Sequence, residues 1–273
     1  MLKEERQQRL LSYVNDRKKA TVEELSAVLD VSKVTVRRDL DELNDVGLVA
    51  KTFGGALSKD SMLSMEIPSS RKTSLCIDEK RLIGQIGAGL VEDGDVVILD
   101  SGTTTLEIAK RIAEKRIIVI TNDLTIALAL ASRPAVTLVL AGGVVESGVN
   151  VATGHIAEEV FSQIHANKTF LGADALSLDD GITDRSYAQL PIKRAMLKAA
   201  EQKFVVADHT KFGRHVFVHV CQLTDIDTLI TDAIDPDFES SVRSLGIEVI
   251  AGQSKTMLPS EKTRSPLGPL GSI

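Results

Sequence analysis

Seven short apolar runs, separated by segments with helical periodicity, follow one another from Val96 to Ile250. Strands that are buried on both faces of a sheet have such continuous apolar runs, and the helices that connect parallel strands cover those faces. The alternation therefore predicts an α/β fold, with an open, mainly parallel sheet between helices, within residues 76–252. The expected strands are residues 96–99, 117–120, 136–140, 169–171, 204–206, 228–230 and 247–250.

Composition excludes several broad classes of protein. The chain has 273 residues, of which 43% are hydrophobic and 26% charged, as in an ordinary globular protein of one or two domains. No apolar run approaches the roughly 20 residues of a membrane helix, and the first residues lack the apolar stretch of a signal peptide. We expect a cytoplasmic protein with no membrane partner. Cys76 and Cys221 are far apart and lack metal-ligand spacing, so we expect no disulfide framework, metal site or cofactor.

Three short helices are predicted at the N-terminal end of the chain. The first covers residues 1–16, which carry apolar side chains at the spacing of an amphipathic helix. Thr21 and Glu24 have the spacing of a capping box and mark the start of the second helix. Ser32 can cap the third helix, which we expect to end near Val46.

The third predicted helix has one narrow apolar stripe, formed by Val36, Leu40 and Leu43. At about 100° per residue, Val34 and Arg38 lie nearly opposite this stripe. A helix that buries one side and offers Lys, Thr and Arg near its N-terminal half suits the major groove of DNA, because such side chains hydrogen-bond base edges. The candidate DNA-contacting residues on this helix are Ser32, Lys33, Val34, Thr35, Arg37 and Arg38.

A strand-like stretch, residues 48–53, follows the third helix and ends at the turn signal Gly54-Gly55. We interpret this stretch as a wing, on which Lys51 would contact a DNA phosphate or the adjacent minor groove. A plainer alternative stays open, since most basic residues on helices form solvated faces and three short helices can form any small bundle. The formal net charge of −6 does not decide between DNA binding and the plainer alternative. Residues 1–57 are charge-balanced, and the whole excess of acidic residues lies beyond them.

The full succession of these motifs resembles one family of regulators. Residues 3–57 are similar to the winged helix-turn-helix domain of the DeoR family of bacterial sugar-catabolism regulators. The resemblance implies that residues 1–57 bind double-stranded operator DNA, and that two copies within a homodimer or homotetramer occupy a repeated operator. The matching stretches are residues 21–25, Val31-Ser32, residues 35–40, Leu43, Gly47-Leu48 and residues 53–56.

Two further segments lack sustained apolar periodicity. Residues 58–75 are polar and contain Pro68, which is typical of a linker between domains. Residues 253–273 are rich in proline, and we expect them to form a disordered tail.

The most informative polar segment of the α/β region is Asp100–Thr105, directly after the first expected strand. Ligands of open α/β sheets bind at the carboxyl ends of the strands. Gly102 lets the backbone turn close to a ligand, the hydroxyl groups offer donors, and the following helix adds free N–H groups at its start. These features favour a phosphate, although a helix capped by Thr with no ligand fits the spacing equally well. Neither a Walker loop nor a GxGxxG motif is present, which counts against a nucleoside triphosphate or NAD.

Polar residues at other expected strand ends would converge with this segment on one edge of the sheet. Aspartates supply acceptors for hydroxyl groups, while Lys193 and Lys211 could hold a phosphate. That mixture suits a phosphorylated sugar or polyol. The candidate effector-binding residues are Asp100, Ser101, Gly102, Thr103, Thr104, Thr105, Thr121, Asn122, Gly142, Gly143, Asp174, Lys193, Asp208 and Lys211.

This region is also similar to the effector domain of the DeoR family, which shares its fold with ribose-5-phosphate isomerase and the CoA transferases. With the N-terminal match, the resemblance covers residues 3–252 and includes Asp100–Thr104, residues 172–174, residues 193–196 and residues 225–232. It implies a sugar-phosphate sensor in which Gly102, Thr103 and Thr104 bind the phosphate. Around the sugar it places Asp100, Asn122, Asp174 and Lys193.

Three residues depart from the usual pattern of that family. Ala175 stands where Gly is usual, Asp184 where a second Thr is common, and Gln189 where an acid is common. The last two lie near the expected sugar end of the site, so the identity of the effector cannot be copied from a relative.

The resemblance implies a repressor of a carbohydrate-catabolism operon, relieved by its effector, although nothing in the residues excludes activation. The alternative is a sugar-phosphate isomerase-like enzyme with an accessory DNA-binding segment, in which Asp174 would be the general base and Lys193 the oxyanion partner. We favour the regulator and expect no catalytic residues, because a DNA-binding head on a metabolic enzyme is the rarer arrangement. The spacing of His215 and His219 is not convincing for a metal site.

Overall fold

The computed structural model describes residues 3–17, 19–45, 49–52, 54–58, 72–73, 75–146 and 148–252. Most of the linker expected at residues 58–75 lies outside these ranges, as do Gly47, Phe53 and the tail expected at residues 253–273. Ser58, the first residue of that expected linker, is the last residue of a strand.

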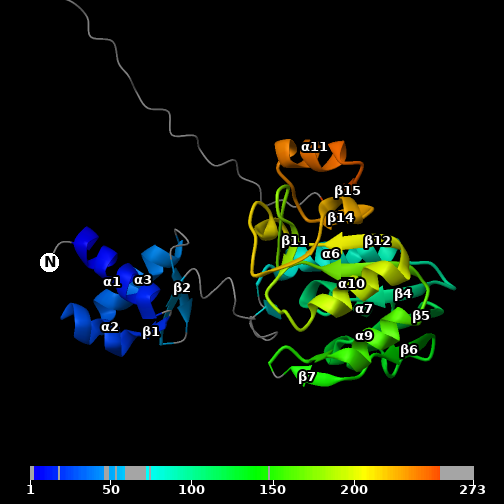
Figure 1. Ribbon diagram of the computed structural model, residues 1–273, viewed down its shortest axis with the longest axis horizontal. Coiled ribbons are helices and arrows are strands. Elements are labelled where there is room, and N and C mark those ends of the chain that lie inside the picture. The colour runs from blue at the N-terminus through cyan, green and yellow to red at the C-terminus, as the bar shows by residue number, and fades with distance from the viewer. Residues whose placement is uncertain are drawn as a thin grey trace, which may run out of the picture.

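The N-terminal part is a winged helix-turn-helix, as predicted (Figure 1). Its helices are α1 (Lys3–Arg17), α2 (Val22–Leu29) and α3 (Lys33–Asp45). Its antiparallel sheet has the order β1-β3-β2, with β1 (Lys19–Thr21), β2 (Val49–Thr52) and β3 (Gly55–Ser58). The β2–β3 hairpin is the expected wing, whereas the three residues of β1 were not predicted, because so short a strand has no readable periodicity.

Local capping fixes the helix boundaries in this part. The expected capping box is present, since the Glu24 N–H donates to Thr21 Oγ1 at 3.1 Å and the Thr21 N–H donates to Glu24 Oε2 at 2.8 Å. Asp30 ends α2 in the left-handed conformation, with φ of 51°. Ser32 then caps α3, because its Oγ accepts the Thr35 N–H at 3.2 Å. The predicted stripe of α3 is buried in the small core together with Leu10 and Val14 of α1.

The C-terminal part is the predicted α/β domain, and all seven expected strands lie in one parallel sheet (Figure 1). The sheet order is β15-β14-β12-β9-β4-β5-β6. The strands are β4 (Val96–Leu99), β5 (Ile117–Thr121), β6 (Val136–Leu140), β9 (Ala166–Gly172), β12 (Ala200–Val206), β14 (Thr228–Thr231) and β15 (Glu248–Ala251). The chain therefore starts in the middle of the sheet and winds first toward β6, then from β9 toward β15.

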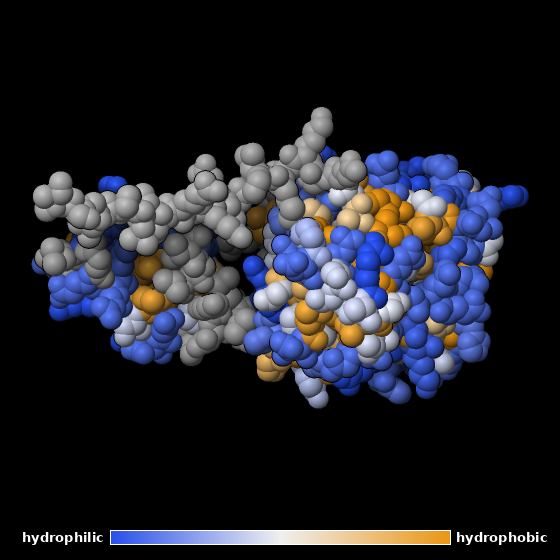
Figure 2. Space-filling model, turned by 90° about the horizontal axis from the view of Figure 1, so that it is seen from above, coloured by the Kyte–Doolittle hydropathy of each residue, from blue (hydrophilic) through white to orange (hydrophobic). Residues whose placement is uncertain are grey.

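Helices cover both faces of this sheet and divide its interior into two cores. Successive residues of a strand point to opposite faces, so Val97 and Leu99 pack in one core and Ile98 in the other. The helices are α6 (Ile77–Gly89), α7 (Thr103–Ile112), α8 (Leu124–Leu130), α9 (His155–Ser162), α10 (Leu190–Ala199) and α11 (Pro236–Ser244). Figure 2 shows that hydrophilic residues cover most of the visible face of this domain, with apolar residues gathered in separate patches.

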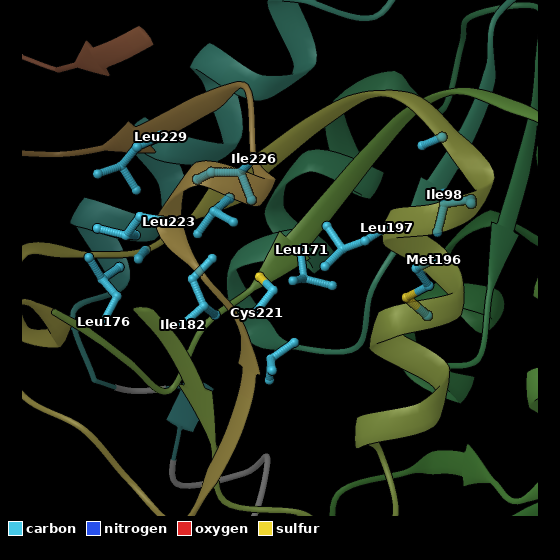
Figure 3. Packing of buried hydrophobic residues seen from close by; sticks show 14 of the residues in the cluster. Ile98, Leu171, Leu176, Ile182, Met196, Leu197, Cys221, Leu223, Ile226 and Leu229 are labelled. Carbon is cyan, nitrogen blue, oxygen red and sulfur yellow. The ribbon is translucent and has the colours of Figure 1, made fainter. Parts of the chain in front are cut away.

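Two small antiparallel elements complete the α/β domain and were not predicted. One is the hairpin of β7 (Val144–Glu146) and β8 (Val151–Thr153). The other is a sheet of order β10-β11-β13, formed by β10 (Ala175–Ser177), β11 (Gly181–Asp184) and β13 (Val218–Cys221). Figure 3 shows Leu176, Ile182 and Cys221 of this sheet directed into the same buried cluster as Leu171 of β9.

A close backbone approach explains one glycine of the second sheet. Gly181 has φ of +64°, and a Cβ at this position would lie 2.3 Å from the carbonyl oxygen of Cys221 on the adjacent strand. A side chain would therefore separate β11 from β13. Among the described residues, no helix is both long enough and apolar enough to span a bilayer.

A buried ion pair joins α1 to α3 in the winged domain. Arg6 donates from Nε and Nη2 to the two carboxylate oxygens of Asp39, at 2.5 and 2.9 Å. Only 2% of the Asp39 side chain is exposed, so this carboxylate depends on protein groups for solvation. Arg9, one helical turn farther along α1, instead pairs with Glu5 on the exposed face.

We expect Arg6→Met to destabilise the winged domain by about 3 kcal/mol, because it leaves the Asp39 carboxylate buried without a cation. Hydrogen–deuterium exchange of the α1 and α3 amides in the full chain measures this loss locally. Arg9→Met is the matched control, with an expected loss below about 0.5 kcal/mol for an exposed pair. Equal losses of stability in the two variants would show that the Arg6–Asp39 pair stabilises the domain no more than an exposed pair does.

Candidate functional site

A cavity of about 290 Å³ lies at the carboxyl ends of β4, β9 and β12. β4 and β9 are neighbours at the point where the winding of the chain reverses, which is where open α/β sheets bind their ligands. Asp208 follows β12, Asp174 follows β9, and residues 101–105 lead from β4 into α7. The sheet order therefore brings three separate segments of the sequence to one site.

The start of α7 forms one wall of the cavity. Gly102 precedes the helix with φ of +146°, and its N–H donates to the buried Asp123 carboxylate at 3.2 Å. The first helical hydrogen bond runs from the Leu106 N–H to the Gly102 carbonyl oxygen at 3.0 Å. The N–H groups of Thr103–Thr105 have no acceptor among the described residues. Together with the positive end of the helix dipole, these three donors suit an anion.

Lys193 forms the buried centre of the site. Its ammonium group donates to Asp100 Oδ2 at 2.5 Å and to the Gly172 carbonyl oxygen at 3.1 Å, and it lies 3.2 Å from Asp184 Oδ2. Burial alone would lower the pKa of Lys193, but Asp100 and Asp184 raise it well above its ordinary value. Burial, together with the neighbouring Asp184, raises the pKa of Asp100 although the Lys193 ammonium lowers it. Lys193 therefore remains a cation at every physiological pH.

Asp174 is the second charged centre of the cavity. Its Oδ1 accepts from Lys72 Nζ at 3.0 Å, and its Oδ2 lies 3.7 Å from Arg185 Nε. Burial would raise the pKa of Asp174, but Lys72, Arg185 and Lys211 outweigh this effect and lower it. The carboxylate is therefore ionised, and its charge is balanced by cations from distant parts of the sequence.

A third lysine is held without a carboxylate. Lys80 of α6 is 5% exposed and donates from Nζ to the carbonyl oxygens of Lys72 and Leu75, at 2.5 and 2.6 Å. Burial lowers the pKa of Lys80, which fits an ammonium group satisfied only by neutral acceptors. Lys72 and Lys80 both line the cavity, but neither is a predicted site residue, because α6 and the turn before it are not at a strand end.

Most of the predicted effector-binding residues line the cavity. Asp100 lies behind the cavity wall, where it is 1% exposed and pairs with Lys193. Of the three departures, Asp184 and Gln189 line the cavity and Ala175 does not. Gln189 Oε1 accepts the Ser101 hydroxyl at 3.0 Å. The predicted residues that line the cavity are Ser101, Gly102, Thr103, Thr104, Thr105, Asp174, Lys193, Asp208 and Lys211.

Four other predicted residues lie outside the cavity wall, and two of them, Asn122 and Gly143, contact strand β8 of the hairpin. Thr121 Oγ1 accepts the Asp123 N–H at 3.1 Å, and Asn122 Nδ2 donates to the Ala152 carbonyl oxygen at 2.9 Å. Gly142 and Gly143 precede β7, and a Cβ on Gly143 would lie 2.3 Å from the Thr153 carbonyl oxygen. The hairpin itself contributes to the site, since Val149 and Val151 line the cavity.

The α3 surface has the exposure predicted for a DNA-reading helix. The side chain of Arg38 is 82% exposed and Val34 is 72% exposed, opposite the buried stripe. Several basic residues pair with acids of the same domain: Lys33 Nζ lies 2.6 Å from Glu23 Oε1, and Lys51 pairs with Asp41. The two hydroxyl groups of Ser32 and Thr35 hydrogen-bond to each other at 2.9 Å.

The described residues contain no cluster of three or more His, Cys, Asp or Glu side chains that could hold a metal ion. His215 Nδ1 instead lies 3.1 Å from Asp180 Oδ2 on the surface.

We expect Lys193→Met to destabilise the α/β domain by about 3–5 kcal/mol near neutral pH, since Asp100 and Asp184 lose their shared cation. A carboxylate whose folded pKa is raised costs stability above its unfolded pKa, and protonation relieves that cost as the pH falls through the folded pKa. The deficit relative to the wild type should therefore shrink on going from about pH 7.5 to about pH 5.

Urea unfolding of both proteins at the two pH values measures this change. Lys198→Met, on the exposed side of the same helix, is the control and should show a small deficit that does not vary with pH. If the loss of unfolding free energy in Lys193→Met is the same at both pH values, the loss does not come from carboxylates that lack their cation.

Two family models match this chain. The DeoR-like helix-turn-helix domain matches residues 6–62, and the DeoR C terminal sensor domain matches residues 75–233. The second match contains the cavity wall from α6 to β12, and the first contains α2, α3 and the wing.

Similar proteins align along nearly their whole length. The HTH-type transcriptional regulator YulB of Bacillus subtilis is 33% identical over 253 residues, which cover 92% of this chain and 97% of that protein. The lactose phosphotransferase system repressor of Streptococcus mutans is 33% identical over 239 residues, which cover 87% and 95% of the two chains.

A solved structure gives a more distant likeness. Ribose 5-phosphate isomerase A from Methanocaldococcus jannaschii aligns with a TM-score of 0.38 and 15% identity, over 50% of this chain and 55% of that chain. So distant a likeness supports no conclusion about function. The sequence relatives are named as transcriptional regulators and not as enzymes. With both domain models matched in order along the chain, this protein belongs to the DeoR family of DNA-binding transcriptional regulators.

Proposed function

We propose that this protein represses a carbohydrate-catabolism operon in the cytoplasm and that a phosphorylated sugar or polyol, bound in the cavity of the α/β domain, controls its affinity for operator DNA. The observation that carries the proposal is the composition of the cavity wall. The N–H groups of Thr103–Thr105, which have no acceptor among the described residues, line the same cavity as the ammonium groups and the ionised Asp174 carboxylate. Repression is supported by the name of the Streptococcus mutans relative.

The proposed ligand uses the two kinds of group in different ways. Its phosphate accepts from the N–H groups and hydroxyls of Thr103 and Thr104, with Lys211 as a neighbouring cation. Among the described residues, no carboxylate pairs with the Lys211 ammonium, so its charge is available to an anion. The sugar hydroxyls donate to carboxylate oxygens such as those of Asp174 and Asp208. A cavity of about 290 Å³ is at the small end of ligand sites, which fits a single phosphorylated sugar.

The winged domain is proposed to read the operator with α3 in the major groove. Arg38, Arg37, Thr35 and Val34 would contact base edges there, and Lys51 on the wing would contact phosphate. Two copies of the chain, in a homodimer or homotetramer, would occupy a repeated operator. Ligand binding would favour one arrangement of the copies over another.

The isomerase alternative is not favoured. A general base works best when its pKa is close to the operating pH, whereas Lys72, Arg185 and Lys211 lower the pKa of Asp174. Lys193, the other candidate, is buried against Asp100 and Asp184, and its ammonium group already has three acceptors.

A thermal-shift screen tests the sensor function directly. The compounds are glucose 6-phosphate, fructose 1-phosphate, tagatose 6-phosphate, glycerol 3-phosphate and inorganic phosphate, each compared with its unphosphorylated parent where one exists. A ligand that binds only the folded state raises the melting temperature in proportion to the logarithm of its concentration over Kd. Stabilisation by the parent sugars as strong as by their phosphates would contradict the proposal.

Arg38→Ala should weaken binding to a duplex selected from a randomised pool by about 1–3 kcal/mol, because a base contact is lost. The melting temperature should be unchanged, since the Arg38 side chain is 82% exposed. Fluorescence anisotropy measures the affinity, and Arg9→Ala, an exposed arginine on α1, is the control. A large loss of thermal stability without a selective loss of DNA affinity would place Arg38 in a structural role.

The double variant Thr103→Ala/Thr104→Ala should keep its affinity for the same duplex but lose most of its response to ligand. Two hydroxyl donors to the phosphate are removed, at about 1 kcal/mol or more each. The double variant Thr224→Ala/Ser240→Ala, at exposed positions of the same domain, is the control. A normal ligand response in the Thr103/Thr104 variant would show that the phosphate binds elsewhere.

A further inference from the structure

Lys72 lines the cavity and also lies within residues 58–75, the expected linker between the two domains. Residues 59–71 separate it from Ser58, the last residue of the wing. It is therefore among the first described residues on the α/β side of that connection. Its side chain lines the cavity that also contains Gly102–Thr105, and it is 22% exposed. No other described residue so close to the wing in sequence lines this cavity.

The backbone at Lys72 is fixed to the α/β domain through one buried cation. Lys80 Nζ donates to the carbonyl oxygens of Lys72 and Leu75, and the Leu75 N–H donates to the Lys72 carbonyl oxygen at 3.3 Å. This short turn leads directly into α6, where the Lys80 N–H bonds to the Cys76 carbonyl oxygen at 3.0 Å. The carbonyl oxygen of Lys72 is thus held by a residue of the cavity wall.

The ammonium group of Lys72 can exchange its partner without leaving a bare charge. In this structure it donates to Asp174 Oδ1 at 3.0 Å. The other oxygen of Asp174 lies 3.7 Å from Arg185 Nε, and Lys211 adds to the positive field on the carboxylate. Asp174 therefore keeps a cation when Lys72 turns to another anion. The neighbouring Lys193 has no such freedom, because it is 3% exposed and held by two carboxylates.

We propose that Lys72 is an effector-binding residue whose ammonium group transfers from Asp174 to the ligand phosphate, and that this transfer carries the signal of ligand binding into the connection to the DNA-binding domain. This inference rests on the proposed function of the cavity and deepens it. Ligand binding would change the side-chain contacts of Lys72, the described residue of the α/β domain nearest to the wing in sequence, while Lys80 still holds its carbonyl oxygen. Linkage makes the effect reciprocal, so DNA binding alters ligand affinity by the same factor.

The experiment compares full-length wild type with three variants. Lys72→Met removes the charge and keeps much of the volume, and Lys72→Arg keeps the charge. Lys168→Met is the matched control, because Lys168 forms a similar half-buried pair with Asp95 at 2.6 Å but lies outside the cavity wall. Calorimetry gives Kd for inorganic phosphate, glucose 6-phosphate, fructose 1-phosphate, tagatose 6-phosphate and glycerol 3-phosphate. Anisotropy gives the Kd for the selected duplex with no ligand and with saturating ligand, as a ratio for each protein.

Lys72→Met should bind the responsive compound about tenfold more weakly, as expected for loss of a charge-assisted hydrogen bond. At saturation, the ligand-induced change in duplex affinity should fall from about tenfold or more in the wild type to less than about threefold. Lys168→Met should match the wild type in both respects. Lys72→Arg should retain ligand affinity and the ratio of duplex affinities within about threefold.

Three results would overturn the inference. Unchanged ligand affinity in Lys72→Met would remove Lys72 from the ligand site, and an unchanged ratio at saturation would remove it from the signal. A Lys72→Arg variant as deficient as Lys72→Met would exclude a role based on charge. If none of the compounds binds the wild type or alters its duplex affinity, the proposed function itself fails. If the wild type responds and Lys72→Met responds equally, only the role of Lys72 fails.

Discussion

The buried ammonium group of Lys193 determines the architecture of the cavity. It joins Asp100 after β4, the Gly172 carbonyl at the end of β9, and Asp184 at the end of β11. Removing three charged groups from water is costly, and the arrangement is stable only because each of them has a partner at hydrogen-bonding distance. The attraction between these groups offsets the cost of their desolvation only when the ends of β4, β9 and β11 bring them together. The interaction therefore favours one geometry of the cavity wall. It also turns Asp100, which the sequence places at the site, into a support for a neighbouring lysine.

The lysines around the cavity differ in how firmly protein groups hold them. Lys193 pairs with two carboxylates and is 3% exposed, Lys80 donates to two carbonyl oxygens, and Lys72 pairs with Asp174, which also lies near Arg185. Lys211 pairs with no carboxylate among the described residues. An incoming anion competes least with the partners of Lys211 and most with those of Lys193. The order of availability therefore follows from burial and partner type.

The sequence predicted the parallel strands well because burial on both faces leaves long apolar runs, and the capping box at Thr21 is a local signal. It predicted the site where the strand ends belong to the neighbouring strands β12, β9 and β4. Thr121 ends β5, Asn122 follows it, and Gly142 and Gly143 follow β6. Both strands lie on the far side of β4 from β9, and these four residues do not line the cavity. Lys72 and Lys80 reach it from a turn and a helix, through tertiary contacts that leave no periodic signal. The short strands β7, β8, β10, β11 and β13 are likewise stabilised by the surfaces they cover.

The charge balance of the winged domain has a consequence for the proposed DNA complex. Lys33 pairs with Glu23, Lys51 with Asp41 and Arg38 with Glu42, all on exposed surfaces. Each basic side chain must leave an acid before it can contact DNA, and the acid then returns to water. Such an exchange reduces the electrostatic gain from any phosphate backbone, which is the main source of non-specific affinity. Base contacts reached by α3 are not reduced in the same way, because hydrogen-bond geometry at the base edges and not net charge determines them. In the proposed complex, a charge-balanced reading domain would therefore shift the balance of affinity toward sequence recognition, and would leave little excess affinity for the proposed ligand to overcome.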